Sequence, residues 1–158
     1  MDFKAFIEIP LNSNIKYEVD EETGELTVDR FLHTAMSYPF NYGYVKETKG
    51  KDGDPLDVCI FSSLPVTPGV VMKCHAIGLL EMEDEGGIDT KIFAVPDKKI
   101  DPIFGVWTSV KDVPEVVLAR TRHFFEHMKE LEPGKWVKTG EFKDASEAEK
   151  EIEASKNK

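Results

Sequence analysis

The 158-residue sequence predicts an α+β protein that is mainly β: a closed or partly closed β-barrel followed by C-terminal helices. Short stretches of alternating apolar and polar residues, separated by turn-forming residues, occupy the chain before residue 110. Helical patterns come only after that point. We find no internal repeat and no linker, so we expect one domain over residues 1–158, which is long enough to bury one core.

The first strands are expected at residues 5–9, 15–19 and 26–31, with a turn at 20–24 between the second and third. Alternation places Glu8 across from its apolar neighbours. It also puts Lys16 and Glu18 on one face of the second strand, opposite Ile15, Tyr17 and Val19. Taken alone, these charges are typical of the solvated face of an antiparallel sheet.

An aromatic loop is expected at residues 38–44, where tyrosines alternate with turn formers. Tyrosine offers a hydroxyl donor on a rigid ring, which is useful for holding a phosphate oxygen, but plain packing explains the pattern equally well. A strand follows the acidic loop at residues 56–61. After a turn at 65–69, a long strand at 70–82 is expected, with a bend at Gly78.

A second acidic stretch surrounds a hairpin at residues 86–87. Asp84 precedes this hairpin, and Asp89 and Lys91 share one face of the following strand, opposite Ile92 and Ala94. We expect Glu83 and Glu85 to be solvated residues at the tip.

Two helices are predicted near the end of the chain. Asp112 reads as an N-cap, Pro114 lies in the first turn and Glu115 completes a capping box, so this helix should run to about Leu131. The last helix should start at Asp144 or Ser146 and fray over residues 155–158.

The most informative stretch is residues 51–58, which places three carboxylates within six positions. Gly53 permits turn conformations and Pro55 fixes its own φ, so Asp52 and Asp54 sit on a tight loop. Asp57 stands at the head of the following strand. Like charges this close raise one another's pKa unless a cation lies between them, and Mg²⁺ or Ca²⁺ would fit. An acidic surface turn is equally consistent, whereas the spacing does not fit a calcium EF-hand.

Composition narrows the function classes. Lys and Arg number 20 against 30 Asp and Glu, a net charge of −10, which argues against nucleic-acid binding through basic patches. No apolar run is long enough for a membrane span or a signal peptide. Cys59 and Cys74 lie in apolar stretches without metal-ligand spacing, so we expect buried thiols and a cytoplasmic protein.

The segment Asp-Gly-Asp-Pro-Leu-Asp-Val at 52–58 resembles the signature loop of the soluble family I inorganic pyrophosphatases of bacteria and archaea. The resemblance extends from Phe-Ile-Glu-Ile-Pro at 6–10 to the last helix. It implies a five-stranded OB-like barrel, Mg²⁺-dependent hydrolysis of pyrophosphate to two phosphates, and a homohexamer built as a dimer of trimers. Mn²⁺ and Zn²⁺ are alternative metals.

The resemblance also assigns roles to individual residues. Asp52, Asp57 and Asp89 would hold the first Mg²⁺, with Asp57 bridging to a second. Asp84 and Asp89 would hold a metal that arrives with substrate, and Glu8 and Glu18 would support a further one through water. Asp54 would be the general base for a metal-bridged water. Phosphate oxygens would be bound by Lys16, Arg30, Tyr42, Lys91 and Lys129, with Tyr38 packed beside them.

One position departs from the family pattern. The family usually carries a tyrosine before the lysine that corresponds to Lys129, and this chain carries Met128. A thioether cannot donate a hydrogen bond, and a bond with one charged partner is worth about 1.5–3 kcal/mol. We therefore expect a raised KM or loosened product binding rather than loss of activity.

His123 and His127 fit the H-x-x-E-H pattern of some zinc peptidases, since residues at i and i+4 share a helix face. The sequence offers no third ligand. The resemblance instead implies a contact between trimers, and a plain surface role is the alternative.

Two other functions compete with a pyrophosphatase. One is a catalytically weak module on the same barrel that binds phosphorylated ligands or nucleic acid, although a single-strand binder needs a basic groove with stacking aromatics. The other is an Mg²⁺ phosphatase for larger phosphate esters, which residue types alone do not exclude.

Overall fold

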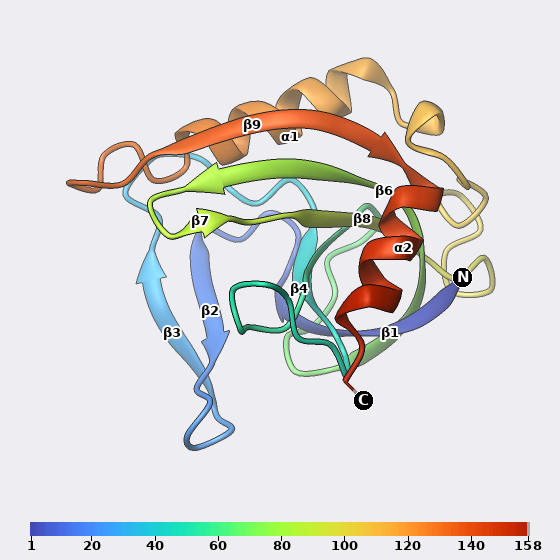
Figure 1. The fold of residues 1–158 in the computed structure, drawn as a ribbon, viewed down its shortest axis with the longest axis horizontal. Helices are drawn as coiled ribbons and strands as arrows, with labels where there is room; N and C mark the ends of the chain where they lie inside the picture. The colour runs from blue at the N-terminus through green and yellow to red at the C-terminus, as the bar shows by residue number, and fades with distance from the viewer. Residues whose placement is uncertain (158) are drawn as a thin grey trace.

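The computed structural model describes residues 1–157 and consists of a curved sheet with two helices beside it (Figure 1). The strands are β1 (Asp2–Ile9), β2 (Ile15–Val19), β3 (Leu26–Phe31), β4 (Asn41–Val45), β5 (Asp57–Ile60), β6 (Val71–Asp84), β7 (Gly87–Ile88), β8 (Lys91–Pro96) and β9 (Val137–Asp144). The helices are α1 (Glu115–His127) and α2 (Ala145–Ser155), and a 3₁₀ turn spans Val110–Asp112.

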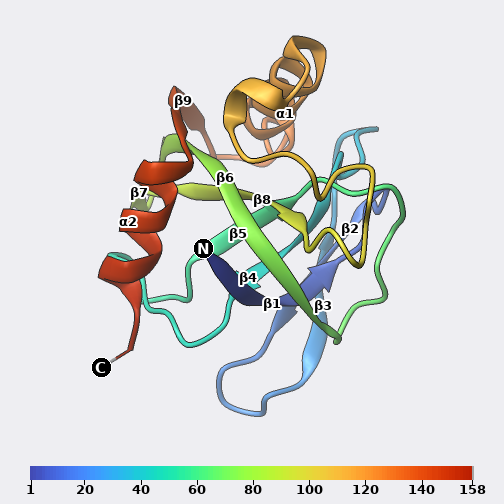
Figure 2. The same cartoon turned by 90° about the vertical axis from the view of Figure 1, so that its right-hand side faces the viewer.

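Five strands close into a barrel in the order β1-β4-β5-β8-β6, because β1 also pairs with β6. All of these pairings are antiparallel except β5 with β8, so the barrel is mixed. Figure 2 shows β6 crossing the barrel, with α2 beside it. The predicted closed five-stranded barrel with helices late in the chain is therefore confirmed.

The aromatic loop expected at 38–44 is confirmed only over residues 38–40, because the remainder belongs to β4, a barrel strand between β1 and β5. Gly43 explains the error. A Cβ at this position would lie 1.8 Å from the Phe6 carbonyl oxygen, so only glycine allows β4 to approach β1 this closely. A glycine among tyrosines is typical of a turn in sequence, yet here it marks a tight strand contact.

Four further strands extend the barrel or stand apart from it. β2 and β3 form a separate hairpin that projects from the barrel (Figure 1), and its register shifts between Lys16 and Tyr17. β7 pairs with the end of β6. β9 pairs along β6, and no strand was predicted at its position.

The helix predictions are partly wrong. Asp112 does not cap α1; with Ser109 it forms a capping box on the 3₁₀ turn. Val113 and Pro114 are extended, as expected before and at a proline, so α1 begins only at Glu115 and has no side-chain cap. It ends at His127, short of Leu131. The last helix is confirmed, with the Asp144 carboxylate accepting a hydrogen bond from the Ala145 N–H.

Two clusters of buried side chains fill the interior. One lies under α1 and contains Tyr38, Phe40 and Phe124; the other lies under α2 and contains Val45, Leu56 and Ile152. Cys59 and Cys74 are buried and free, as predicted. No helix within residues 1–157 is long and apolar enough to cross a membrane.

Candidate active site

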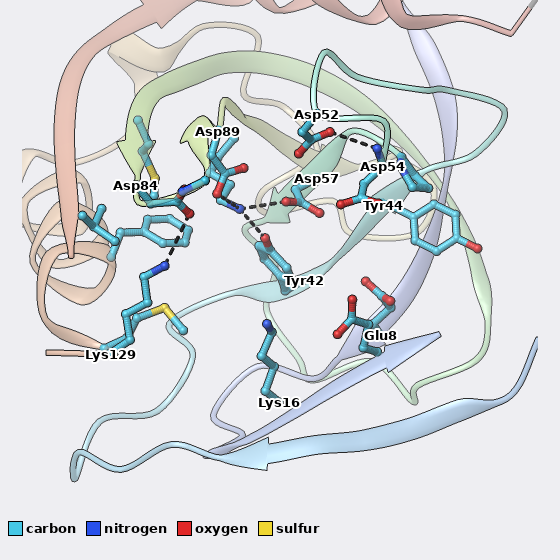
Figure 3. Close-up of a pocket in the computed structure, with 18 of the residues that line it drawn as sticks. Glu8, Lys16, Tyr42, Tyr44, Asp52, Asp54, Asp57, Asp84, Asp89 and Lys129 are labelled. Atoms are coloured by element: carbon cyan, nitrogen blue, oxygen red, sulfur yellow. Dashed lines mark hydrogen bonds and ion pairs between the residues drawn. The ribbon is translucent and has the colours of Figure 1, made fainter. Parts of the chain in front are cut away.

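A pocket of about 710 Å³ opens on one side of the barrel, between the β2–β3 hairpin, the acidic loop and the end of α1 (Figure 3). Nine carboxylate side chains and three lysines line it. The carboxylates belong to Glu8, Glu18, Glu21, Asp52, Asp54, Asp57, Asp84, Glu85 and Asp89, and the lysines are Lys16, Lys91 and Lys129. Residues from distant parts of the sequence therefore converge on one strongly acidic cavity.

The floor of the pocket is built on adjacent barrel strands. Lys91 begins β8, Asp57 begins β5, and Tyr42 lies on β4, so strand pairing alone brings them together. The Lys91 Nζ lies 2.7 Å from an Asp57 oxygen, 3.0 Å from an Asp89 oxygen and 2.7 Å from the Tyr42 hydroxyl. One buried ammonium thus joins two carboxylates and a phenol.

The opposite charges within this group stabilise the charged form of Lys91. Burial disfavours the charged form of Lys91, but Asp57, Tyr42 and Asp89 outweigh it and hold the Lys91 pKa well above its usual value. Burial raises the pKa of Asp89, and Lys91 opposes that rise. Lys91 therefore stays positively charged across the neutral range and offsets part of the local negative charge.

The acidic loop forms the exposed rim of the pocket. Gly53 has φ of +87°, as its place in a tight turn required, and the Asp54 N–H donates to Asp52 Oδ1 over 3.0 Å. Burial, followed by the negative charge of Asp52, raises the pKa of Asp54. Asp57 stands at the head of β5, as predicted. The two exposed aspartates and Asp57 all face the same cavity.

Glu8 lies opposite this rim, on β1. Its side chain is buried and accepts a hydrogen bond from the Val19 N–H at 3.1 Å. Burial raises the pKa of Glu8 to about 7, although the Val19 bond opposes the rise. Glu18 and Lys16 reach the pocket from β2. Tyr17 and Val19 line it too, and the pairing of β2 with β3 shifts register between Lys16 and Tyr17.

The far end of the pocket is formed by β6 and the segment after α1. Lys129 Nζ lies 3.3 Å from an Asp84 oxygen and 3.2 Å from a Glu85 oxygen. Glu85, expected to be merely solvated, thus lines the pocket and contacts one of its lysines. Met128 lies beside Lys129 and lines the cavity as well.

Arg30 is the one predicted substrate-binding residue that does not line the main pocket. It lines a smaller hollow of about 100 Å³ together with Lys16, Met128, Lys129 and Lys135. Its guanidinium contacts Asp29 on its own strand and Glu132 after α1. The buried Glu132 was not singled out from sequence, because nothing local in the sequence indicates its contact with a strand a hundred residues away.

The remaining predicted residues are one buried tyrosine and two histidines of α1. Tyr38 is buried, lines the pocket and packs against Tyr42 with ring centroids 5.6 Å apart. His123 and His127 lie on α1 with ring centroids 4.4 Å apart, and the His127 Nδ1 lies 2.7 Å from a Glu130 oxygen. Neither histidine lines the pocket.

The donor set suits a hard divalent cation, since it consists of carboxylate oxygens from several strands and one loop. Within residues 1–157, no three Asp, Glu, His or Cys side chains are gathered closely enough to form a ready-made metal cluster. For Asp57 and Asp89 the reason is that the Lys91 ammonium lies between their carboxylates. The ligand chemistry fits Mg²⁺, and a cation binding there has to compete with this ammonium.

Comparison with known proteins shows how this arrangement relates to a family. The family model described as inorganic pyrophosphatase matches residues 5–158. The chain belongs to the inorganic pyrophosphatase family. The expected subgroup, family I of bacterial and archaeal type, and the expected enzyme class, an inorganic diphosphatase, are thereby confirmed.

Individual inorganic pyrophosphatases match over nearly their whole length. The chain is 54% identical to the one from Aquifex pyrophilus over 151 residues, covering 96% of this chain and 85% of the relative. The solved structure from Coxiella burnetii has a TM-score of 0.94 at 49% identity, covering 98% and 92% of the two chains. The structure from Helicobacter pylori has a TM-score of 0.95 at 44% identity, covering 98% and 91%.

Proposed function

We propose that the chain hydrolyses inorganic pyrophosphate to two phosphates in an Mg²⁺-dependent reaction within the large acidic pocket. The observation that carries this proposal is the convergence of nine carboxylates and three lysines from separate elements on one cavity. The carboxylates repel a polyanionic substrate unless cations are bound among them. The same carboxylates attract such cations and hold them in the pocket. Family membership supports the same conclusion.

Asp52, Asp57 and Asp89 are the proposed ligands of a first ion, with Asp57 shared by a second. Asp84 and Asp89 would hold an ion that accompanies the substrate, and Glu8 and Glu18 would hold another through water. Bound divalent cations neutralise phosphate charge and lower the pKa of a water held between them. Mn²⁺ and Zn²⁺ provide the same charge with different ligand preferences.

Asp54 is the proposed general base. It stands on the exposed rim, opposite Glu8 and next to Asp57, where a carboxylate oxygen can take a proton from an attacking water (Figure 3). Its raised pKa moves it toward the range in which a base accepts a proton effectively near neutral pH. Its N–H bond to Asp52 fixes the backbone next to the carboxylate.

The cationic side chains are proposed to bind the phosphate oxygens. Lys16 and Lys129 reach the cavity from opposite elements and act as point charges, whereas Arg30 would offer a forked contact from the adjoining hollow. Lys91 and the Tyr42 hydroxyl supply donors at the floor. The side chains therefore orient the substrate between the cations and the base.

A phosphate-release assay tests the proposal. Pyrophosphate, a nucleoside triphosphate and a simple phosphate monoester are compared with and without Mg²⁺. We expect rapid release from pyrophosphate only, and only with Mg²⁺. Preferential release from the monoester would favour the phosphatase for larger esters, and binding without release would favour the weak binding module. The net charge of −10 argues against nucleic acid as the ligand of such a module.

A homohexamer built as a dimer of trimers is part of the same proposal. His123 is exposed on α1 and His127 is half-buried, so both are accessible for contact with another copy. Sedimentation of the intact protein tests the assembly, and a monomer at micromolar concentration would contradict it. A cytoplasmic location stays a prediction, supported by two free cysteines.

A further inference from the structure

The two stems of the acidic loop are joined by the Val45 N–H, which donates to the Leu56 carbonyl over 2.8 Å, and by one buried threonine. Thr48 lies between β4 and the acidic tip, with only 5% of its surface exposed. Its hydroxyl donates to the Val45 carbonyl over 2.6 Å and accepts from the Leu56 N–H over 3.0 Å. Val45 ends β4 and Leu56 immediately precedes β5. The Thr48 hydroxyl thus joins the two stems of the loop that carries Asp52 and Asp54.

A segment from the other end of the chain holds the outer side of the same stem. Residues 155–157 run antiparallel to residues 47–49, with Thr48 opposite Lys156. The Lys49 N–H donates to the Ser155 carbonyl over 2.6 Å, and the Asn157 N–H donates to the Glu47 carbonyl over 2.9 Å. These three paired positions and the Thr48 hydroxyl form what we term the loop clasp.

The clasp rests on rigid structure. Ile152 of α2 is fully buried in the same core cluster as Val45 and Leu56. Ser155, which accepts the bond from Lys49, is itself buried. The position of the 155–157 segment is therefore set by the packing of α2 against the barrel. The hydrogen bonds to this segment then fix the position of the stem.

The tip beyond the clasp is held mainly by its own bonds. The Gly50 N–H donates to the Asp54 carbonyl over 2.7 Å, and the Gly53 N–H donates to the Gly50 carbonyl over 3.0 Å. These bonds keep the shape of the tip, but they do not orient it relative to the barrel. The clasp, together with the Val45–Leu56 backbone bond, places Asp52 and Asp54 relative to Asp57.

We propose that Thr48 is a positioning residue for the metal-binding loop, acting through its hydroxyl and supported by the 155–157 segment. The inference rests on the proposed roles of Asp52 and Asp54. Groups that orient metal ligands typically change metal affinity or activity by about 10–100-fold when they are removed. Thr48 acts through the backbone rather than on a ligand directly, so we expect the lower end of that range.

The test compares Thr48→Val, Thr48→Ser and a matched control, Thr121→Val. Thr121 is a second buried threonine, whose hydroxyl donates to the Val117 carbonyl within α1, away from the loop. Mn²⁺ binding is measured by calorimetry on each folded protein without substrate. We expect Thr48→Val to weaken Mn²⁺ binding about tenfold. Thr48→Ser, which keeps the hydroxyl, should bind within about twofold of the unmodified chain, and Thr121→Val should match it even though its Tm falls.

Asn157→Pro supplies a second, independent variant if Thr48→Val does not fold. It removes the N–H that bonds Glu47, and the preceding Lys156, with ψ of 138°, already has the extended conformation that proline requires. It should weaken Mn²⁺ binding about threefold, because the Thr48 hydroxyl still joins the two stems. Unchanged Mn²⁺ affinity in both Thr48→Val and Asn157→Pro would overturn the clasp, as would equal weakening in Thr48→Ser. Absence of Mg²⁺-dependent phosphate release from the unmodified chain would overturn the proposed function instead, and the calorimetric comparison would still decide the role of Thr48.

Discussion

The carboxylates of this protein fall into two groups that differ in what surrounds them. In the pocket, Glu8, Asp54 and Asp89 face other carboxylates, and burial together with like charge raises their pKa values. Outside the pocket, Asp101 and Asp144 face backbone N–H groups and hydroxyls, and the pKa of each is lowered. The ionised carboxylate is thus destabilised by its surroundings in the pocket and stabilised by them at Asp101 and Asp144.

Asp101 shows how complete the structural arrangement is. Its two oxygens accept hydrogen bonds from the N–H and hydroxyl of Ser63 and from the N–H groups of Ile103 and Phe104, at 2.8–3.2 Å. Burial raises the pKa of Asp101, but these bonds favour the ionised form and outweigh that effect. All four bonds come from groups of the chain itself, so this carboxylate connects two loops, and it lines neither the pocket nor the smaller hollow.

The difference identifies which carboxylates are available for chemistry. A carboxylate whose partners are donors is stabilised by folding, whereas one whose neighbours are carboxylates is stabilised by a cation that arrives later. The pocket therefore has an excess of negative charge that bound divalent cations would neutralise. Four substitutions test this division, beginning with the largest expected effect.

Asp54→Asn should abolish most activity without affecting the fold. Loss of a general base lowers turnover by about 10²–10⁴-fold, and an amide cannot accept the proton. Because Asp54 is exposed and raised in pKa, the folded protein should keep its Tm. Measuring kcat for pyrophosphate with saturating Mg²⁺ checks this, with Asp97→Asn, outside the pocket, as the matched control. Full turnover in Asp54→Asn would remove that residue from the mechanism.

Lys91→Met should destabilise the protein, because Asp57 and Asp89 lose the ammonium that lies between them. Removing one partner of a buried ion pair typically costs 3–5 kcal/mol. Because the side chain of Asp57 is partly exposed, we expect the free energy of unfolding, measured with urea, to fall by about 2–3 kcal/mol. Lys143→Met, which removes an exposed partner of Glu81, should cost under about 1 kcal/mol.

Mg²⁺ sharpens the same experiment. If cations complete the charge arrangement of the pocket, adding Mg²⁺ should stabilise Lys91→Met more than the unmodified chain, since binding to the native state adds to stability. Equal stabilisation of the two proteins would show that Lys91 and the cations do not compensate for the same carboxylates.

Asp101→Asn tests the structural group. The folded pKa of Asp101 lies below its unfolded value, so its contribution is fully present above about pH 4 and is lost as the pH falls through the lowered value. At pH 7 the variant should lose about 2 kcal/mol, since several bonds to a charged acceptor are weakened. The difference from the unmodified chain should shrink below pH 4. Urea unfolding at pH 7 and pH 3 measures both values, and a constant difference would contradict the assignment.

The sequence reveals these two groups unequally. The acidic loop could be predicted because its residues are neighbours in the chain, and the order of motifs placed Asp84, Asp89 and Lys91 in the same site. Asp101 and Glu132 could not, because their partners at Ser63 and Arg30 are distant in sequence and leave no local pattern. β4 was missed for the opposite reason: Gly43 produces a strong local turn signal, and the close approach of Phe6 overrides it.

Met128→Tyr should give the smallest effect, and it tests whether a new donor helps the pocket. Met128 is half-buried at the far end of the pocket beside Lys129, so a tyrosine hydroxyl there should be worth the low end of its range, about 1.5 kcal/mol. KM for pyrophosphate should fall about tenfold with kcat little changed, the pattern of an interaction made equally in the ground and transition states. Met128→Phe is the matched control, because it adds the ring without the hydroxyl. If phenylalanine lowers KM as much as tyrosine, packing against Lys129 is responsible and the methionine costs the site no donor; if neither changes KM, substrate phosphate does not reach this end of the pocket.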